Sequence, residues 1–520
     1  PDFYQKHAPM QSLCDEFEKM GVNVEKALAN QHRPAYTLRL YSYDLAKEAA
    51  SMAGTLVRDM TEGSPTRRIV EFFFPLLFGL LFQQVYNMVD TIVVGKFLGV
   101  KALAGVGSTG SLSFLVLGFC IGVCNGFAIP VAQKFGERDY PGLKRFVVNA
   151  ILLAVTFSLV ITAVVCALCS PLLGWMNTPS DIVDDAYAYI FVIFLGIPVV
   201  FIYNVLFSII RSLGDSRTPV IYLVICSLLN VVLDLLFIVS FGMGVEGAAW
   251  ATVISQAVSS LLCVRYIRHC DLIVLTRRDW KLDKTCVKRL IGMGIPTGLQ
   301  YSITAIGSIV LQASVNLLGS SYVASVAAGT KVSQLFCCTF DALGSTMATY
   351  GGQNVGAGRL ERIGKGLKSC SVIGIVYSLA AFGVLSAFGG NLSQMFMDAK
   401  ETLVIANSAL FLTVNSAAYI PLAFVNIVRF LIQGLGFTRQ AVFAGVLEMT
   451  ARVIVGVVMV PAFGYIAVCA ANPAAWVAAD LFLFPAYGWA MRRLAAAHER
   501  NAEKNPDMPG DANTDALAAR

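Results

Sequence analysis

The chain has 520 residues, of which 56% are hydrophobic and only 14% are charged, and its formal net charge is +6. Soluble domains average roughly 25% charged residues, so this composition excludes an ordinary soluble protein and indicates one that lies in lipid. The basic residues form short clusters between long apolar runs instead of one basic domain, which argues against a nucleic-acid partner.

The first 59 residues differ from the rest of the chain. Charges are spread through them, and they contain no apolar run of membrane length. They also lack the basic start, apolar centre and cleavage site of a signal peptide. We expect 1–59 to be a soluble or disordered extension, because the segment that opens at Met60 reads like the start of a membrane protein.

Apolar segments of about 20 residues or more then recur, each long enough to cross a hydrocarbon core roughly 30 Å thick. Twelve such segments are present, at approximately 69–94, 103–131, 146–169, 183–210, 219–241, 246–265, 290–318, 322–352, 367–388, 402–431, 440–462 and 464–490. The predicted fold class is therefore all-α, a polytopic membrane protein with twelve transmembrane helices.

The loops between these spans differ sharply in positive charge. Loops after even-numbered spans hold nineteen lysines and arginines, and loops after odd-numbered spans hold three, at Lys96, Lys101 and Lys400. Short loops rich in lysine and arginine stay in the cytoplasm. We therefore expect both termini to be cytoplasmic in a multi-pass protein of the inner or plasma membrane.

The two halves of the sequence superimpose at an offset of about 221 residues. The matched pairs are Pro75 with Pro296, Gln133 with Gln353, Gly136 with Gly356, Pro198 with Pro421, Gly214 with Gly436 and Arg217 with Arg439. Six spans in each half give both halves the same orientation, so we expect two lobes with the substrate site between them. The predicted lobes are 60–270 and 289–490, with a cytoplasmic loop at 271–288 and a polar tail at 491–520.

Four of the matched residues are prolines inside spans one, four, seven and ten. They are Pro75, Pro198, Pro296 and Pro421. Proline removes a backbone hydrogen bond and can bend a helix. Proline is common in membrane helices in any case, but the fourfold match favours bends that serve gating.

Few ionisable residues lie deep in the spans, and each is a functional candidate because a buried charge is costly in lipid. Asp90 lies towards the end of span one, and Asp234 lies in the middle of span five with Asn230 one turn earlier on the same face. Thr252 follows in span six. Carboxylate, amide and hydroxyl oxygens suit a proton or a hard cation such as sodium. Interfacial capping by Asp90 and a structural hydrogen bond by Asp234 are the alternatives.

The second half offers weaker candidates. Asp341 in span eight is a candidate for handling substrate or protons, with Gln300, Gln312 and Asn204 as further polar residues for a substrate cavity. Glu448 and Arg452 stand four residues apart in span eleven and are expected to form a structural pair.

The positions of the histidines and cysteines do not favour a metal site or thiol chemistry. The histidines, at His7, His32, His269 and His498, all lie outside the apolar spans. Cys166 and Cys169 have CxxC spacing without a second ligand pair, so we interpret them as packing residues. We expect no cofactor and no metal beyond a transported sodium ion at the first-half site.

The runs PLLFGLLFQQVYNMVDTIVVGKFLG, AQKFGERD with its partner GGQNVGAG, and RSLGDSRTP resemble the multidrug and toxic compound extrusion (MATE) family over about residues 60–490. The resemblance implies two six-helix lobes, alternating access, and export of cationic or amphipathic compounds in exchange for protons or sodium ions. It also implies a cation site in the first lobe at positions matched by Asp90, Asn230, Asp234 and Thr252. Other branches of the family carry an acid in span seven, where this chain has Gln300 and Gln312.

Two other classes of function stay open. An exporter or flippase of lipid-linked sugars has a similar fold, but its phosphates favour several arginines, and only Arg429 and Arg452 lie deep in the spans. An intramembrane enzyme is a remote alternative because no nucleophile with a base and no metal-ligand motif is present. The expected partners are small-molecule substrates and the lipid bilayer, and a monomer is expected.

Overall fold

The computed structural model describes residues 58–176, 179–180, 182–270, 273, 275–276, 279–396 and 401–504. Most of the predicted extension, the end of the polar tail and the loop residue Lys400 lie outside these ranges. Throughout the described part every regular element is a helix, which confirms the predicted all-α class.

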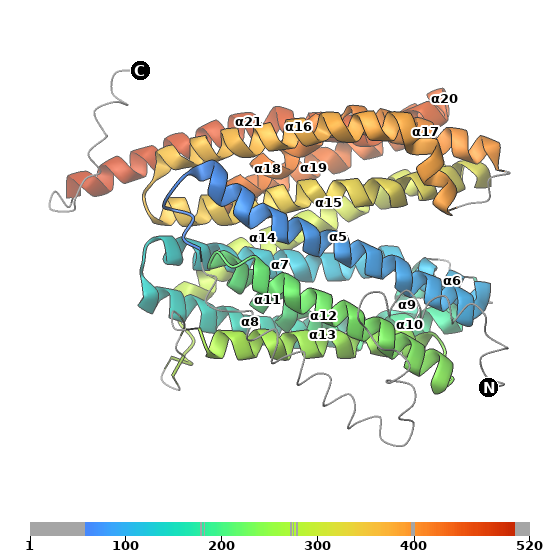
Figure 1. Cartoon of the computed structure of the whole chain (residues 1–520), viewed down its shortest axis with the longest axis horizontal. Coiled ribbons are helices and arrows are strands. Elements are labelled where there is room, and N and C mark those ends of the chain that lie inside the picture. The colour runs from blue at the N-terminus through green and yellow to red at the C-terminus, as the bar shows by residue number, and fades with distance from the viewer. Residues whose placement is uncertain are drawn as a thin grey trace. The chain divides into compact units, whose positions relative to one another are not determined.

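The helices follow the predicted spans in order (Figure 1). The first half contains α5 (Pro65–Phe97), α6 (Gly99–Ser108), α7 (Gly110–Gly136), α8 (Tyr140–Ala167), α9 (Cys169–Trp175), α10 (Val183–Leu195), α11 (Ile197–Ser212), α12 (Arg217–Leu235) and α13 (Val245–Arg268). The second half contains α14 (Lys284–Asn316), α15 (Ser320–Gly356), α16 (Leu360–Ser393), α17 (Thr402–Ala417), α18 (Tyr419–Gly434), α19 (Thr438–Ile454), α20 (Val460–Phe463) and α21 (Tyr465–Lys504).

Two boundaries differ from the prediction. Helix α14 begins at Lys284, inside the predicted inter-lobe loop, because the Asp283 side chain accepts hydrogen bonds from the backbone N–H groups of Thr285 and Cys286 and caps the helix. Helix α21 continues to Lys504, well into the predicted polar tail. Polar residues do not end a helix that has already started, since alanine, arginine and glutamate all favour it.

Among the described residues, nine helices are long and apolar enough to cross a membrane, and two bent helix pairs raise the number of spans to eleven. The remaining predicted span is α14, which has 33 residues but a more polar sequence. It packs mainly against α7 and α19. With α14 included, the described helices make up the twelve spans that the sequence predicts.

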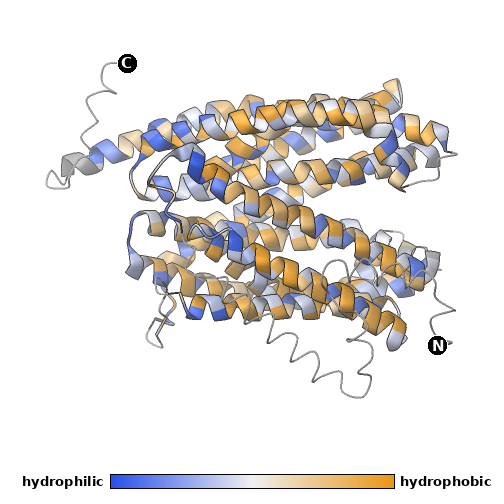
Figure 2. Ribbon diagram, viewed as in Figure 1, coloured by the Kyte–Doolittle hydropathy of each residue, from blue (hydrophilic) through white to orange (hydrophobic). Residues whose placement is uncertain are grey.

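The membrane-facing surface follows from the exposed apolar residues. The span within α8 has a mean hydropathy of 2.6, yet only 22% of it is buried inside the protein. A helix that is this apolar and this exposed requires a lipid environment. Figure 2 shows hydrophilic residues gathered at the end where α8 and α16 begin, while the helices are largely hydrophobic along their length. We call this end, which carries the lysine- and arginine-rich loops, the basic end.

Two of the matched prolines mark sharp bends. Helices α10 and α11 meet at 48° next to Pro198, and α17 and α18 meet at 52° next to Pro421. A proline lacks the N–H that would continue the helical hydrogen bonding, so the chain bends just before it. Pro75 and Pro296 instead lie inside continuous helices, α5 and α14.

A second matched irregularity follows the fifth span of each half. A π-helical turn covers Leu236–Ser240 after α12, and another covers Val455–Met459 after α19. Short π-helical turns inside helices are frequent at functional sites. Here the first one begins two residues after Asp234.

The two halves form two lobes, with α8 and α11–α13 on one side and α15–α19 and α21 on the other (Figure 1). The first helix of each half reaches across. The start of α5 buries Phe72 and Phe73 in the core of the second half, and α14 packs most extensively against α7. The precise lobe boundaries, 60–270 and 289–490, stay a prediction.

At the basic end the lobes meet through a reciprocal contact between α7 and α15. A Cβ atom added at Gly136 would lie 1.9 Å from the carbonyl oxygen of Gln353, and one added at Gly356 would lie 1.9 Å from that of Gln133. Only glycine permits this approach. The two glutamine side chains extend the contact, with Gln133 Nε2 donating to the Gly434 carbonyl at 3.1 Å and Gln353 Nε2 to the Ser212 carbonyl at 2.9 Å.

The segment Arg58–Glu62, which we call the N-terminal strap, lies across this contact. The Met60 backbone N–H donates to Gln353 Oε1 at 2.9 Å, and Arg362 Nη2 donates to the Met60 carbonyl at 3.2 Å. On the other lobe, Arg138 Nη2 donates to Glu62 Oε1 at 2.6 Å. The strap therefore joins both lobes at the basic end.

Candidate functional site

The first-half site is built around Asp234 on α12. Asp234 is completely buried, and Asn230 one turn earlier is 1% exposed. Residues four apart on a helix share a face, so the amide and the carboxylate point towards the same neighbours. Those neighbours are α5 and α13, with which α12 makes its main contacts.

Thr252 on α13 supplies the hydroxyl of the site. Asn230 Nδ2 donates to Thr252 Oγ1 at 3.4 Å, and Thr252 Oγ1 donates to the Ala248 carbonyl at 3.1 Å. The second bond is local to α13 and holds the hydroxyl in place. The oxygen lone pairs that remain on Thr252 are thus available to a further partner.

Asp90 on α5 completes the group. Its side chain is half-buried, and its carboxyl group lies within electrostatic reach of that of Asp234. Helices α5, α12 and α13 therefore bring the four residues predicted for ion coupling to one place.

The acceptor oxygens of this site lack donors. Asp90 Oδ1, Asn230 Oδ1 and both carboxyl oxygens of Asp234 are buried and have no hydrogen-bond partner among the described residues. A buried acceptor without a donor is costly, and a proton or a hard cation bound by oxygen would satisfy it. The donor set contains no histidine or thiolate, which disfavours soft metals.

Two tyrosines near the site were not predicted. The carboxyl groups of Asp90 and Asp234 act electrostatically on the hydroxyls of Tyr86 on α5 and Tyr189 on α10. Tyr86 could have been found, since it precedes Asp90 by one helical turn. Tyr189 could not, because nothing in the sequence of span four relates it to spans one and five.

Among the described residues, the predicted substrate-cavity residues share no hydrogen bond with one another, and their role stays a prediction. Asp341 is exposed on α15 and lies within electrostatic reach of Arg429. Gln300 is buried, and its side-chain oxygen Oε1 accepts a hydrogen bond from Nε2 of Gln433 on α18. The other two, Gln312 and Asn204, bind within their own helices, to Asn316 Oδ1 at 2.9 Å and to the Val200 carbonyl at 2.7 Å.

A polar cluster that the sequence analysis missed joins the halves between α7, α11 and α14. Asn125 Oδ1 accepts from Arg211 Nη2 at 2.9 Å and from Ser208 Oγ at 3.0 Å, and Asn125 Nδ2 contacts the Tyr301 hydroxyl at 3.5 Å. Arg211 is one of the nineteen lysines and arginines assigned by sequence to the loops after even-numbered spans. In the structure it lies half-buried at the end of α11, where its guanidinium group donates to an amide of α7.

A second buried polar group lies within the second half. The expected pair of Glu448 and Arg452 is present, with Oε2 and Nη2 3.5 Å apart. Arg429 on α18 joins it, with Nη2 2.8 Å from Glu448 Oε1. Two arginines thus share one carboxylate.

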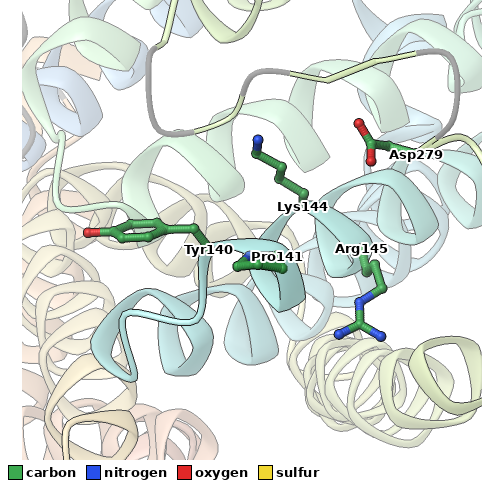
Figure 3. A pocket seen from close by; sticks show the side chains of 5 residues that line it. All are labelled: Tyr140, Pro141, Lys144, Arg145 and Asp279. Atoms are coloured by element: carbon green, nitrogen blue, oxygen red, sulfur yellow. The ribbon is translucent and has the colours of Figure 1, made fainter.

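The surface hollows lie elsewhere. One, of about 370 Å³, lies at the basic end and is lined by Tyr140, Pro141, Lys144, Arg145 and Asp279. Figure 3 shows the first four of these side chains on the start of α8 and Asp279 on the neighbouring loop. Another, of about 460 Å³, lies between α5 and α12 and includes Pro75. Neither contains any of the four ion-site residues.

Comparison with known families finds one that covers most of the membrane region. The sequence profile of the family described as MatE matches residues 75–236 and again residues 296–458, together more than half of the chain. The second match begins 221 residues after the first, which is the offset at which the halves superimpose. The internal repeat is thereby confirmed.

Individual relatives are more distant. The probable multidrug resistance protein YpnP of Bacillus subtilis is 29% identical over 306 residues, which cover 59% of this chain and 68% of that protein. The FAD transporter of Shewanella oneidensis is 25% identical over 371 residues, which cover 69% of this chain and 80% of that protein.

Solved structures share the fold. An outward-facing multidrug resistance MATE family transporter of the MOP superfamily aligns with a TM-score of 0.79 at 22% identity, over 85% of this chain and 98% of that chain. A MATE crystallised in complex with MaL6 aligns with a TM-score of 0.78 at 21% identity, over 85% and 99%.

Proposed function

Because the chain belongs to the MATE family of multidrug efflux transporters, we propose that it is a secondary active antiporter that exports cationic or amphipathic small organic compounds in exchange for protons or sodium ions. One observation carries the ion coupling. Four buried acceptor oxygens of Asp90, Asn230 and Asp234 have no donor among the described residues. A transported cation would satisfy them in one conformation and leave when water reaches them in another.

The contacts at the basic end support alternating access. The lobes touch there through Gly136 and Gly356, and the N-terminal strap crosses the contact. Opening the basic end would require these contacts to break. Two lobes that separate at one end while they meet at the other would expose a site between them to one side of the membrane at a time.

The matched family and the relatives favour export of small compounds over export of lipid-linked sugars. The family consists of transporters, so catalysis is not part of the proposal. We place the protein in the cell membrane as a monomer with both termini in the cytoplasm. The support for this orientation is the excess of lysine and arginine in the loops at the basic end.

The ion-coupling proposal is tested by Asp234→Asn. The substitution keeps the size and hydrogen bonding of the side chain and deletes its charge. We expect normal folding with gradient-driven efflux largely lost, because the remaining acceptors hold a cation far less tightly. Efflux is measured in vesicles with proton and sodium gradients imposed separately. Asp341→Asn, at an exposed position of the second half, should have a smaller effect. Normal efflux by Asp234→Asn under both gradients would contradict the proposal.

The orientation is tested with reporter fusions. A reporter fused after residue 279, in the loop before α14, should lie in the cytoplasm. A reporter fused near residue 180, between α9 and α10, should lie outside. The reverse pattern would show that the basic end faces outward.

A further inference from the structure

Within the second lobe, two buried arginines contact a single buried glutamate. Arg429 on α18 and Arg452 on α19 each approach a different oxygen of the Glu448 carboxylate, at 2.8 and 3.5 Å. All three side chains are at least nine-tenths buried. Two guanidinium groups against one carboxylate leave an excess positive charge inside the membrane-spanning part of the protein.

Part of the donor capacity of this group is unused. Arg452 Nε donates to Asn472 Oδ1 at 3.1 Å, and Arg452 Nη2 faces Glu448. The atoms Arg429 Nε and Arg452 Nη1, however, are buried and have no hydrogen-bond partner in the described part of the chain. An arginine can donate five hydrogen bonds and cannot lose its charge at physiological pH. A bound anion would therefore satisfy these unused donors.

The protein does not supply that anion in this conformation. Asp480 on α21 lies within electrostatic reach of Arg429 and Glu448, but within the described residues it forms no ion pair with either arginine at 4.0 Å or less. One of its carboxyl oxygens is itself buried without a partner. Asp341 is exposed and lies within electrostatic reach of Arg429, but it likewise forms no ion pair with it.

A lipid headgroup is a poor candidate for the anion. Glu448 lies ten residues after the start of α19 at Thr438, or about 15 Å along the helix. That depth corresponds to the hydrocarbon core and not to the headgroup layer. An anion bound at this depth would have to reach the group through the protein, in a conformation that exposes the two arginines.

We propose that Arg429 and Arg452 bind a carboxylate or phosphate group of the exported compound. The pairing follows from chemistry, since guanidinium groups match the planar, two-oxygen geometry of these anions. A single negative charge would also balance the excess positive charge of the Arg429–Glu448–Arg452 group. This inference rests on the proposed function for its substrate, but the site can be tested without transport.

The binding test uses purified full-length protein in detergent without added lipid. Inorganic phosphate and, separately, acetate are titrated against sodium chloride of equal ionic strength while the thermal unfolding midpoint is followed. We expect a saturable rise in the midpoint for the wild type. Arg452→Gln should abolish it, because the remaining Arg429–Glu448 pair carries no net charge. This variant leaves Glu448 paired at 2.8 Å, so it avoids an isolated buried carboxylate.

Two further variants make the binding result decisive. Arg439→Gln removes an exposed arginine near the start of the same helix and should behave as the wild type. Arg452→Lys keeps the charge but loses the forked donor geometry, and it should need at least tenfold more phosphate for half of the effect. No saturable effect in the wild type, or the same effect in Arg452→Gln, would overturn the proposal.

A transport assay distinguishes a failure of the anion site from a failure of the proposed export function. Export from vesicles is compared for two dyes with the same cationic ring system, one with a free carboxylate and one with its methyl ester. Arg452→Gln should lower the ratio of acid to ester export about tenfold, and Arg439→Gln should leave it unchanged. An unchanged ratio in Arg452→Gln would contradict the anion site. If the wild type exported neither dye, the proposed function would fail, while the phosphate titration would still decide the site.

Discussion

Asp139 connects the basic end to the start of α8 through two kinds of bond. Its Oδ1 accepts from the Gly142 backbone N–H at 2.9 Å and caps the helix, while its Oδ2 lies 2.9 Å from Lys134 Nζ. The hydrogen bond from Lys134, followed by that from Gly142, holds the pKa of Asp139 below its usual range. The charged form therefore stabilises the folded state.

Asp139→Ala should lower the free energy of unfolding by about 1 kcal/mol at pH 7, the usual cost of losing such a cap. Because the pKa of Asp139 is lower in the folded state, its contribution is present above its unfolded value and is lost as the pH falls through the folded value. The difference between wild type and variant should thus shrink below about pH 4. The stability difference is measured by thermal unfolding of both proteins in detergent at a series of pH values from neutral to acidic.

Asp139→Asn is the matched control for this prediction. It keeps the side-chain oxygen that caps α8 and removes only the charge. Its stability at pH 7 should lie between those of wild type and Asp139→Ala. A gap between wild type and Asp139→Ala that stays constant down to the lowest pH would contradict the role of the charge.

The functional residues differ in how readily they can be predicted from the sequence. Asp90 and Asp234 stand out because acids are rare in apolar spans, and Asn230 follows from helical spacing. For the buried group of Arg429, Glu448 and Arg452, the sequence predicts the pair of Glu448 and Arg452 but not their contact with Arg429. Spacing relates residues within one helix, whereas the contact between α18 and α19 depends on how the two helices cross.

The bends of whole elements were easier to anticipate than their π-helical turns. Pro198 and Pro421 lack an N–H for the helix, so the bends beside them follow from covalent chemistry. No residue type enforces a π-helical turn, and Leu236–Ser240 looks like an ordinary apolar run. Helix α14 is harder to recognise as a span, because it is not among the helices that are apolar enough by composition to cross a membrane.

The contact between α7 and α15 makes a prediction at the level of elements. Gly136→Ala or Gly356→Ala places a methyl group 1.9 Å from a backbone carbonyl oxygen of the opposite helix. The helices would have to move apart, so the lobes could no longer meet at the basic end. We expect at least a tenfold loss of vesicle efflux with protein of normal abundance.

Gly364→Ala on α16 is the control, since a Cβ atom there would meet nothing within 4 Å. Alanine also favours the helix over glycine by up to about 1 kcal/mol. This variant should transport as the wild type and unfold at the same or a higher temperature. Unimpaired efflux by both Gly136→Ala and Gly356→Ala would show that the close approach is not needed for the cycle.

For the whole molecule, we predict that the extension 1–59 can be removed without loss of membrane insertion or transport, and the N-terminal strap shows which of its residues contribute to stability. Arg58 forms an ion pair with Glu71, and Asp59 lies 3.6 Å from Arg138. A chain that starts at Leu56 keeps these contacts, whereas a chain that starts at Met60 loses them. We expect both to insert into the membrane and the second to unfold at a lower temperature.

The measurement compares the two truncated chains with the full chain in expression, efflux and thermal unfolding. Full efflux from the Leu56 start is expected because the removed segment contains no apolar run of membrane length and the family resemblance begins only near residue 60. Loss of efflux at normal abundance in that chain would show that the extension takes part in transport. Equal stability of the Leu56 and Met60 starts would show that Arg58 and Asp59 contribute nothing to the strap.

Across the whole molecule, the all-α class, the twelve spans and the repeat were predictable because apolar length and matched motifs are local properties. The strap was not. Residues 58–62 lie on both sides of the predicted boundary between the extension and the first lobe, and their partners lie up to 302 residues away. Nothing in a linear sequence relates Met60 to Arg362.

That separation has a consequence for how the protein is made. Met60 and Gln353 are 293 residues apart, and at about 5–20 residues per second a ribosome needs on the order of 15–60 s to extend the chain from one to the other. The first span is therefore inserted long before the partner of its own leading segment exists. Throughout that interval the strap is free for chaperones or proteases to engage, and it can dock only after α15 and the start of α16 have been made.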